Sequence, residues 1–127
     1  MSGILVDTSV WVDHFRNRNK VLEDLLNNDL ALTHPMVIGE IACGTPPAPR
    51  SKTISNLVQL QTTQHVSLHE TMDFIERESM YGVGCGIVDM VLLSSTLITP
   101  GATLWTLDKR LAALAERFGV AHRAALH

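Results

Sequence analysis

The 127-residue sequence is poor in cysteine, in aromatic residues and in net charge, and each shortage excludes a class of protein. Cys43 and Cys85 are the only cysteines, and their spacing is not that of a metal-binding pair, so we expect free thiols in a reducing compartment. Aromatic residues make up 5% of the chain and charged residues 18%, while apolar residues make up 46%. This composition excludes a disordered or fibrous chain and indicates a globular domain with a substantial core.

Long apolar runs and a secretory leader are also lacking. The richest apolar stretch, residues 90–98, contains three hydroxyl residues and is too short to span a bilayer. The N-terminus has no basic segment followed by an apolar one. We therefore expect a cytoplasmic protein without a membrane segment. The length is typical of one domain, so residues 1–127 are expected to fold as a single unit.

A basic excess is absent as well, because the formal net charge is −3. This argues against a protein that holds nucleic acid on a broad basic surface. It does not exclude nucleic acid at a site where divalent cations sit among carboxylates, since such ions invert the local charge.

What the sequence does contain is an alternation of apolar strand-like runs with amphipathic helical segments. Strands are predicted at 4–6, 30–33 and 104–107, with a short extended piece at Val66 and an edge strand at 120–121. Helices are predicted over 8–15, 21–26, 35–43 (closed by Gly44 as a C′ residue), 54–60, 69–81, 87–98 and 108–118. The alternation is typical of an α/β domain with a mainly parallel sheet.

Two acidic residues follow predicted strands directly. Asp7 comes after the strand at 4–6, and Asp108 comes after the strand at 104–107. Ligands of open parallel sheets bind outside the carboxyl ends of the strands, so both carboxylates are candidates for a binding site. The alternative for each is a purely structural role as the N-cap of the next helix.

Two more acidic residues stand out within helices. Asp89 is the only charge in an apolar helix and lies in its first turn, so its carboxylate needs a partner, a proton or a metal ion unless it only stabilises the helix N-terminus. Glu40 lies off the apolar face of its helix among Gly39, Cys43 and Gly44, which suggests the close approach of backbone or ligand. An exposed helical glutamate is the alternative.

The four carboxylates together favour a metal site at one edge of the sheet. Ligands that are all oxygen suit Mg²⁺ or Mn²⁺ better than zinc. Carboxylates that gather in one place repel one another unless cations lie between them. One or two such ions would lower the pKa of a bound water and stabilise a leaving oxygen, which is the chemistry of phosphoryl transfer.

Several short motifs resemble a known family. They are Asp7-Thr8-Ser9-Val10-Trp11 after an apolar strand, Gly39-Glu40-Ile41 in a helix after Thr-His-Pro, Asp89 at the start of an apolar helix, and Leu104-Trp105-Thr106-Leu107-Asp108. In this order and spacing they resemble the PIN-domain ribonucleases, and most closely the VapC toxins of bacterial toxin–antitoxin pairs. The resemblance runs from Ile4 to about Val120.

The resemblance implies a three-layer α/β/α sandwich and Mg²⁺- or Mn²⁺-dependent endonucleolytic cleavage of RNA. It implies Asp7, Glu40, Asp89 and Asp108 as the catalytic and metal-binding acids, with Thr8 and Thr106 placing hydroxyls near the metal or its waters. It also implies a VapB-type antitoxin, a homodimer and a toxin–antitoxin hetero-oligomer.

Other residues are weaker candidates. Arg16, Arg50, Lys52, Lys109 and Arg110 can contact RNA phosphates, although solvated surface charge is the alternative for each. The tryptophans, Trp11 and Trp105, can stack bases but lie beside core-like residues. A zinc pair formed by His65 and His69 lacks the surrounding motif of a zinc protease.

Two other functions remain open on the sequence alone. One is a non-catalytic binding module whose acids merely cap helices. The other is a metal-dependent phosphatase, although Ser9 stands where the paired aspartate of one large phosphatase class is expected.

Overall fold

The computed structural model describes residues 3–123. Three short strands are present there: β1 (Ile4–Val6), β2 (Ala31–Leu32) and β3 (Thr103–Trp105). They alternate with helices in the order that the sequence pattern predicts. The helices are α1 (Thr8–Asn17), α2 (Lys20–Asn27), α3 (Pro35–Cys43), α4 (Arg50–Val58), α5 (Leu68–Arg77), α6 (Ile87–Ile98) and α7 (Lys109–Arg117).

The strands form one parallel sheet in the order β2-β1-β3. Leu5 of β1 is in register with Leu32 of β2 and with Leu104 of β3. Single parallel bridges extend both edges, from Thr33 to Thr62 and from Leu104 to Ala121. The predicted edge strand at 120–121 is therefore present only as one bridge, closed by a 2.7 Å bond from Leu104 N–H to the Val120 carbonyl.

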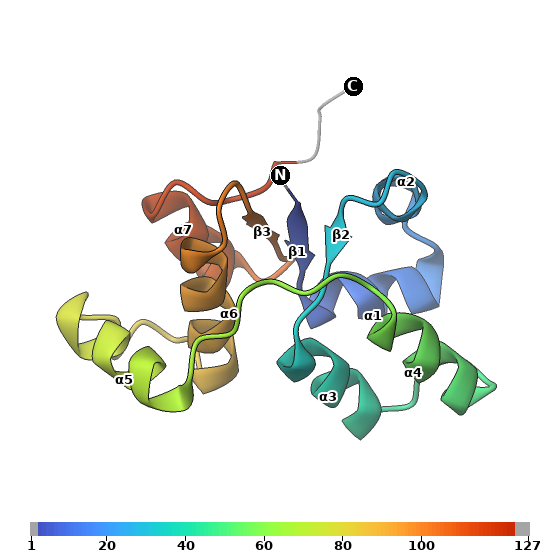
Figure 1. Cartoon of the computed structure of the whole chain (residues 1–127), viewed down its shortest axis with the longest axis horizontal. Coiled ribbons are helices and arrows are strands. Elements are labelled where there is room, and N and C mark those ends of the chain that lie inside the picture. The colour runs from blue at the N-terminus through green and yellow to red at the C-terminus, as the bar shows by residue number, and fades with distance from the viewer. Residues whose placement is uncertain (1–2, 124–127) are drawn as a thin grey trace.

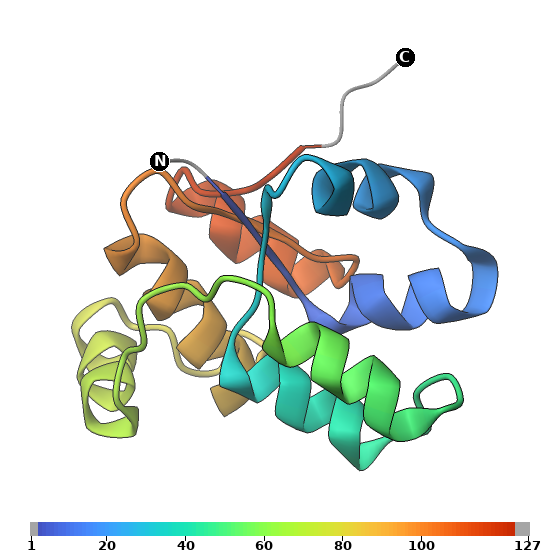
Figure 2. The same cartoon turned by 45° about the vertical axis from the view of Figure 1, so that its right-hand side comes forward.

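Helices pack against this sheet from both sides. Figure 1 shows α5, α6 and α7 on the β3 side of the sheet and α1 to α4 on the β2 side. In Figure 2, α3 and α4 lie side by side, and the loop that joins them contains Pro46, Pro47 and Pro49. The central strand side chains are nearly inaccessible, with Leu5 and Val6 at 0% exposure and Leu104 at 1%. The predicted α/β sandwich with a parallel sheet is confirmed.

Most helix boundaries agree with the sequence pattern, and the apolar helix predicted over 87–98 is found with those bounds as α6. The helix predicted over 69–81 is too long, since α5 ends at Arg77. Ser79 takes a positive φ of 55°, and the N–H of Met80 bonds back to the Ile75 carbonyl at 2.8 Å. This is a Schellman C-cap, and it turns Met80 into the core, where it is 2% exposed.

Val66, predicted in a short extended piece, lies in a segment without helix or strand, and its N–H donates to the Ser95 hydroxyl at 3.3 Å. Two other local predictions are wrong. The strand predicted over 104–107 ends at Trp105, because Thr106 and Leu107 turn out of the ladder toward Asp7 and Ser9. Gly44 is the C-cap of α3 with φ −100°, in extended conformation, and not a left-handed C′ residue.

The strand order defines where a ligand can bind. The chain leaves β1 toward β2 on one side and returns to β3 on the other, so the crossovers diverge at the carboxyl ends of β1 and β3. Open α/β sheets bind ligands in the crevice at such a switch point.

The buried His34, which follows β2, forms hydrogen bonds with both α3 and α6. The Nδ1 atom of His34 accepts the Met36 N–H at 3.0 Å and so caps α3. In the neutral ring Nε2 then carries the proton and donates to the Ser95 hydroxyl at 3.3 Å. Burial, and secondarily the nearby His65, lower the pKa of His34 to about 4.

We expect the protein to lose stability in acid through His34. The unfolded chain takes up a proton near pH 6.5, whereas the folded chain resists it until about pH 4. The contribution of His34 is therefore fully present above pH 6.5 and falls as the pH drops toward 4, by about 1–3 kcal/mol in all. Urea unfolding at pH 7.5, 6 and 5 measures this.

His34→Asn is the matched control, because asparagine also accepts at an N-cap but does not titrate. The variant should show a shallower loss of unfolding free energy between pH 6.5 and 4. Parallel pH dependences of the two proteins would contradict the assignment.

Candidate functional site

The carboxyl ends of β1 and β3 lie next to each other. Val6 pairs with Trp105 at the end of both strands, and the N–H of Asp7 continues the ladder to the Trp105 carbonyl at 2.9 Å. Asp7 then begins the turn into α1, and Asp108 begins α7 three residues after Trp105. The two strand-end acids of the sequence analysis therefore leave the same edge of the sheet.

Asp7 is nearly buried, at 6% exposure, and one of its carboxylate oxygens is fully engaged. Its Oδ2 accepts the hydroxyls of Ser9 at 2.7 Å and of Thr106 at 2.8 Å, together with the Ser9 N–H at 3.4 Å. Among residues 3–123 no group donates to Oδ1, and Oδ1 is not among the buried atoms that lack a partner. Oδ1 is therefore the oxygen that solvent or a ligand can reach.

Asp108 is exposed and caps α7. Its Oδ1 accepts the backbone N–H groups of Arg110 at 2.9 Å and of Leu111 at 3.1 Å. Its own N–H donates to the Thr106 hydroxyl at 3.0 Å. Both strand-end acids are thus N-caps, as the structural alternative for each proposed.

Glu40 reaches the site from α3. The Thr8 hydroxyl, at the start of α1, donates to Glu40 Oε1 at 2.6 Å, which links two segments 32 residues apart. The expected close approach of backbone to Gly39 is wrong for the described residues, since a side chain added there would have no atom within 4 Å. Glu40 itself is exposed and lies beside the start of α1.

Asp89 is half-buried in the first turn of α6, directly after the glycine-rich loop. Burial raises its pKa, and the charges of Asp7, Asp108 and Glu40 raise it further, while a backbone hydrogen bond from Gly86 acts in the opposite direction. All three other acids thus lie within electrostatic range of Asp89. The four predicted carboxylates therefore lie in the same region of the molecule.

The donor chemistry of this cluster fits Mg²⁺ or Mn²⁺, because every candidate ligand is a hard carboxylate oxygen. Mutual repulsion at Asp89 is the condition that a bound cation relieves. Within residues 3–123, however, no three acidic, histidine or cysteine side chains stand close enough to form a complete cage. One oxygen each of Asp7, Glu40 and Asp108 accepts a hydrogen bond from a protein donor.

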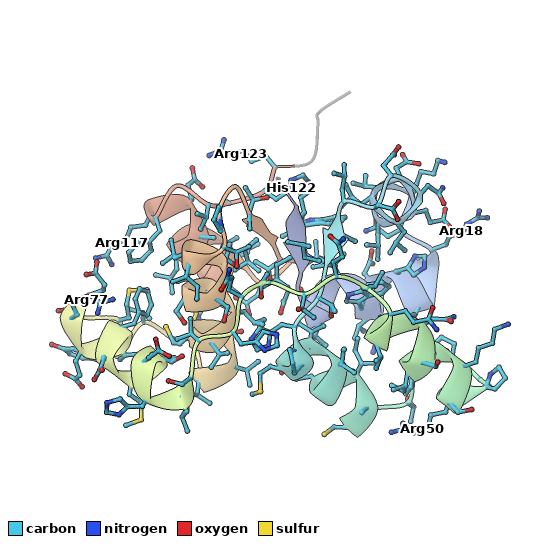
Figure 3. All side chains as sticks on the ribbon, in the orientation of Figure 1. Arg18, Arg50, Arg77, Arg117, His122 and Arg123 are labelled. Carbon is cyan, nitrogen blue, oxygen red and sulfur yellow. The ribbon has the colours of Figure 1, made fainter. Side chains whose placement is uncertain are left out.

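The five basic residues that were predicted to contact RNA differ from one another in their surroundings. Arg50 binds the end of α3, donating to the carbonyls of Ala42 at 2.5 Å and Gly44 at 3.2 Å (Figure 3). Arg110 donates to the Gly84 carbonyl at 3.4 Å and packs against Gly84, whose φ is +84°. Lys52 and Lys109 are exposed.

A groove of about 510 Å³ is lined by Arg16 together with Thr8 and Glu40 of the candidate site. Apolar and small residues form the rest: Val12, Phe15, Ile41, Gly44, Thr45, Pro46 and Pro47.

Two residues of the site were not singled out from the sequence. Ser9 contacts Asp7, and Cys85 has its pKa raised by burial and by the charges of Asp89 and Asp108. Ser9 follows Asp7 by two residues, the spacing of a local side-chain turn, which is the signal that could have found it. Cys85 lies in the glycine loop before Asp89 and carried no comparable signal.

The remaining candidate residues have structural contacts that explain their positions. Trp11 and Trp105 are 4% and 7% exposed, so they are core residues and not open stacking platforms. His65 packs on the ring of His34, whereas His69 pairs with Asp73 at 3.6 Å, so the two histidines of the suggested zinc pair have separate partners. No helix in the described part of the chain is long and apolar enough to cross a membrane.

Comparison with known proteins gives a consistent result. The sequence profile of the PIN domain matches residues 4–117. Ribonuclease VapC32 of Mycobacterium tuberculosis, from strains CDC 1551 / Oshkosh and ATCC 25618 / H37Rv, is 42% identical to this chain over 118 residues. The alignment covers 93% of the chain and 94% of each relative.

Repulsion within the acidic cluster predicts that Asp89→Asn stabilises the metal-free protein. Because the pKa of Asp89 is raised, its ionised form is less favourable in the folded chain than in the unfolded one, and this cost applies at pH 7. In EDTA at pH 7 we expect the unfolding free energy to rise by about 0.5–2 kcal/mol.

Glu76→Gln, which neutralises an exposed carboxylate on α5, is the control and should change stability little. The difference between Asp89→Asn and wild type should shrink as the pH falls and Asp89 becomes protonated. A destabilised Asp89→Asn at pH 7 would argue against the repulsion.

Proposed function

This chain belongs to the PIN-domain family, and we propose that it is a metal-dependent endoribonuclease that acts as the toxin of a toxin–antitoxin pair. The observation that carries the proposal is the convergence of Asp7, Glu40, Asp89 and Asp108 at the β1/β3 edge. A relative named Ribonuclease VapC32, similar over nearly the whole chain, supports RNA as the substrate.

In this proposal Asp7 and Asp89 hold one or two Mg²⁺ or Mn²⁺ ions, and Glu40 and Asp108 complete the acidic set. When bound, the metal supplies a water of lowered pKa and stabilises the charge that develops on the phosphate and the leaving oxygen. Asp7 presents Oδ1 to the site while its Oδ2 is held by protein hydroxyls. Thr8 orients Glu40 through its hydroxyl. These contacts fix the acids before substrate arrives, so less ordering is needed during the reaction.

RNA is proposed to approach the acids along the groove between α1 and α3. That groove shares Thr8 and Glu40 with the site and carries a positive charge at Arg16. A guanidinium can bind a phosphate on either side of the cleaved bond. Phe15 offers an aromatic surface to a base.

A VapB-type antitoxin, a homodimer and a toxin–antitoxin hetero-oligomer in the cytoplasm are also part of the proposal. They rest on the resemblance to the VapC toxins and on the relative's name. A short neighbouring reading frame that encodes a DNA-binding antitoxin would support this role.

One observation favours a second candidate, a non-catalytic binding module. Asp7 and Asp108 both cap helices, and a protein that uses its acids only in this way needs no metal. Metal affinity separates the two candidates, because a capping role alone predicts none.

The direct test of the proposed activity is cleavage of RNA by Asp7→Asn and Asp89→Asn. Each substitution removes a ligand charge with little change in shape, so we expect the rate in Mg²⁺ or Mn²⁺ to fall at least about a hundredfold. Wild type in EDTA should be equally inactive.

Asp73→Asn on α5 serves as the matched control and should cleave RNA at the wild-type rate. Cleavage that persists in EDTA, or full activity in both site variants, would refute the proposed function.

The proposed RNA path predicts that Arg16→Ala weakens substrate binding more than catalysis. Loss of one phosphate contact should raise KM roughly fivefold to tenfold, leave kcat nearly unchanged and reduce the salt dependence of binding. Steady-state cleavage of a short RNA at several salt concentrations measures all three quantities.

Arg77→Ala removes an exposed arginine from α5, on the far side of the molecule from α1 (Figure 3). It should leave KM unchanged. Equal effects of the two substitutions would show that overall charge, and not the groove, governs binding.

A further inference from the structure

Ser9 holds together three parts of the acidic site. Its hydroxyl donates to Asp7 Oδ2 at 2.7 Å and accepts the Leu107 N–H at 3.0 Å. It also lies 3.3 Å from the Thr106 hydroxyl. Ser9 belongs to α1, whereas Leu107 lies in the segment between β3 and α7, so this one oxygen joins elements 98 residues apart.

The direction of each hydrogen bond follows from counting protons. An ionised carboxylate only accepts, so the hydroxyls of Ser9 and Thr106 both direct their single proton to Asp7 Oδ2. Their lone pairs then remain for backbone donors, the Leu107 N–H at Ser9 and the Asp108 N–H at Thr106. The 3.3 Å contact between the two hydroxyls is the longest of the set and needs no proton.

Two parallel chains of hydrogen bonds result. One runs from Leu107 N–H through the Ser9 hydroxyl to Asp7, and the other runs from Asp108 N–H through the Thr106 hydroxyl to the same oxygen. Hydrogen bonds in such a chain polarise one another and strengthen the final bond to the carboxylate. The arrangement also fixes the segment that carries Asp108 relative to Asp7.

We propose that Ser9 is a positioning residue of the site, which reserves Asp7 Oδ1 for the metal and sets the distance between Asp7 and Asp108. This inference rests on the proposed function, since it assigns Ser9 a role toward the metal. Residues that orient a metal-binding carboxylate through hydrogen bonds commonly change metal affinity 10- to 100-fold when replaced.

Thr106 alone does not fulfil this role. The Thr106 hydroxyl also reaches Asp7 across the fold, but it contacts Asp7 before α1 begins and leaves the Leu107 N–H to Ser9. Ser9 is the member that links α1 to the β3–α7 segment. Loss of the Ser9 hydroxyl therefore frees Asp7 Oδ2 from one donor and also leaves the Leu107 N–H without its acceptor.

The test is Mn²⁺ binding to the full chain without RNA, measured by calorimetry for wild type, Ser9→Ala and Ser9→Thr. We expect Ser9→Ala to weaken Mn²⁺ binding by about tenfold or more. Ser9→Thr keeps the hydroxyl and should bind within about threefold of wild type. Cleavage rates at subsaturating Mn²⁺ should follow the same order, and excess Mn²⁺ should partly restore Ser9→Ala.

Ser67→Ala is the matched control, because Ser67 caps α5 as part of a capping box far from the acids. It should lower the thermal midpoint by a few degrees without changing Mn²⁺ affinity. Equal losses of affinity in Ser9→Ala and Ser67→Ala would show that Ser9 acts only through general stability, and this would overturn the proposal.

Amide hydrogen exchange gives a readout that does not depend on metal. The Leu107 N–H should exchange faster in Ser9→Ala, and Ser9→Thr should restore its protection. Wild type that binds no Mn²⁺ would overturn the proposed function together with the metal role of Ser9. Wild type that binds Mn²⁺, with Ser9→Ala binding equally well, would overturn the Ser9 proposal alone.

Discussion

The parallel pairing of β1 with β3 is the constraint on which the rest of the site depends. Strands of three residues make few hydrogen bonds, and the apolar side chains of Leu5, Val6 and Leu104, buried almost completely, hold them in register. Because the side chains of a strand alternate between two faces, a slip of one residue would turn these side chains away from their contacts. It would also move Asp7 relative to Thr106 and break the 2.8 Å bond between them. The same burial that stabilises the sheet therefore also aligns the acids.

Placing four carboxylates near one edge of the sheet lowers the stability of the folded chain, and Asp89 shows this effect most clearly. Its pKa is raised first by burial in an apolar helix and then by the charges of the other three acids. The Gly86 backbone and the N-terminus of α6 oppose this effect. Neighbouring residues such as Leu92 and Leu93 are fully buried and offer no counter-charge. A fold selected for stability alone would have little reason to keep this acid, so its presence favours a role in binding cations.

The sequence predicted what depends on local pattern and failed where tertiary contacts decide. Strands rich in Ile, Leu and Val, and α6 with its apolar circumference, follow from residues a few positions apart. The end of α5 depends on whether Met80 can reach the core, and the coil at Val66 depends on Ser95 being beside it, so neither was visible locally. Asp7, Asp89 and Asp108 could be chosen from their strand-end and helix-start positions, whereas the choice of Glu40, which lies within α3, rested most on the family resemblance. From the sequence, Ser9 could not be distinguished from any other serine in the first turn of a helix. Its partners Thr106 and Leu107 are almost a hundred residues away in the sequence.

Helix capping and metal binding are often treated as competing explanations of an acidic residue, but a carboxylate has two oxygens. Asp7 uses Oδ2 for the Ser9 N–H and two hydroxyls, and this leaves Oδ1 without a donor among residues 3–123. Asp108 caps α7 through Oδ1, so its Oδ2 is the oxygen that remains for other contacts. A carboxylate held in this way has lost its rotational freedom during folding and not during ligand binding. The caps at Asp7 and Asp108 are therefore compatible with the proposed metal site.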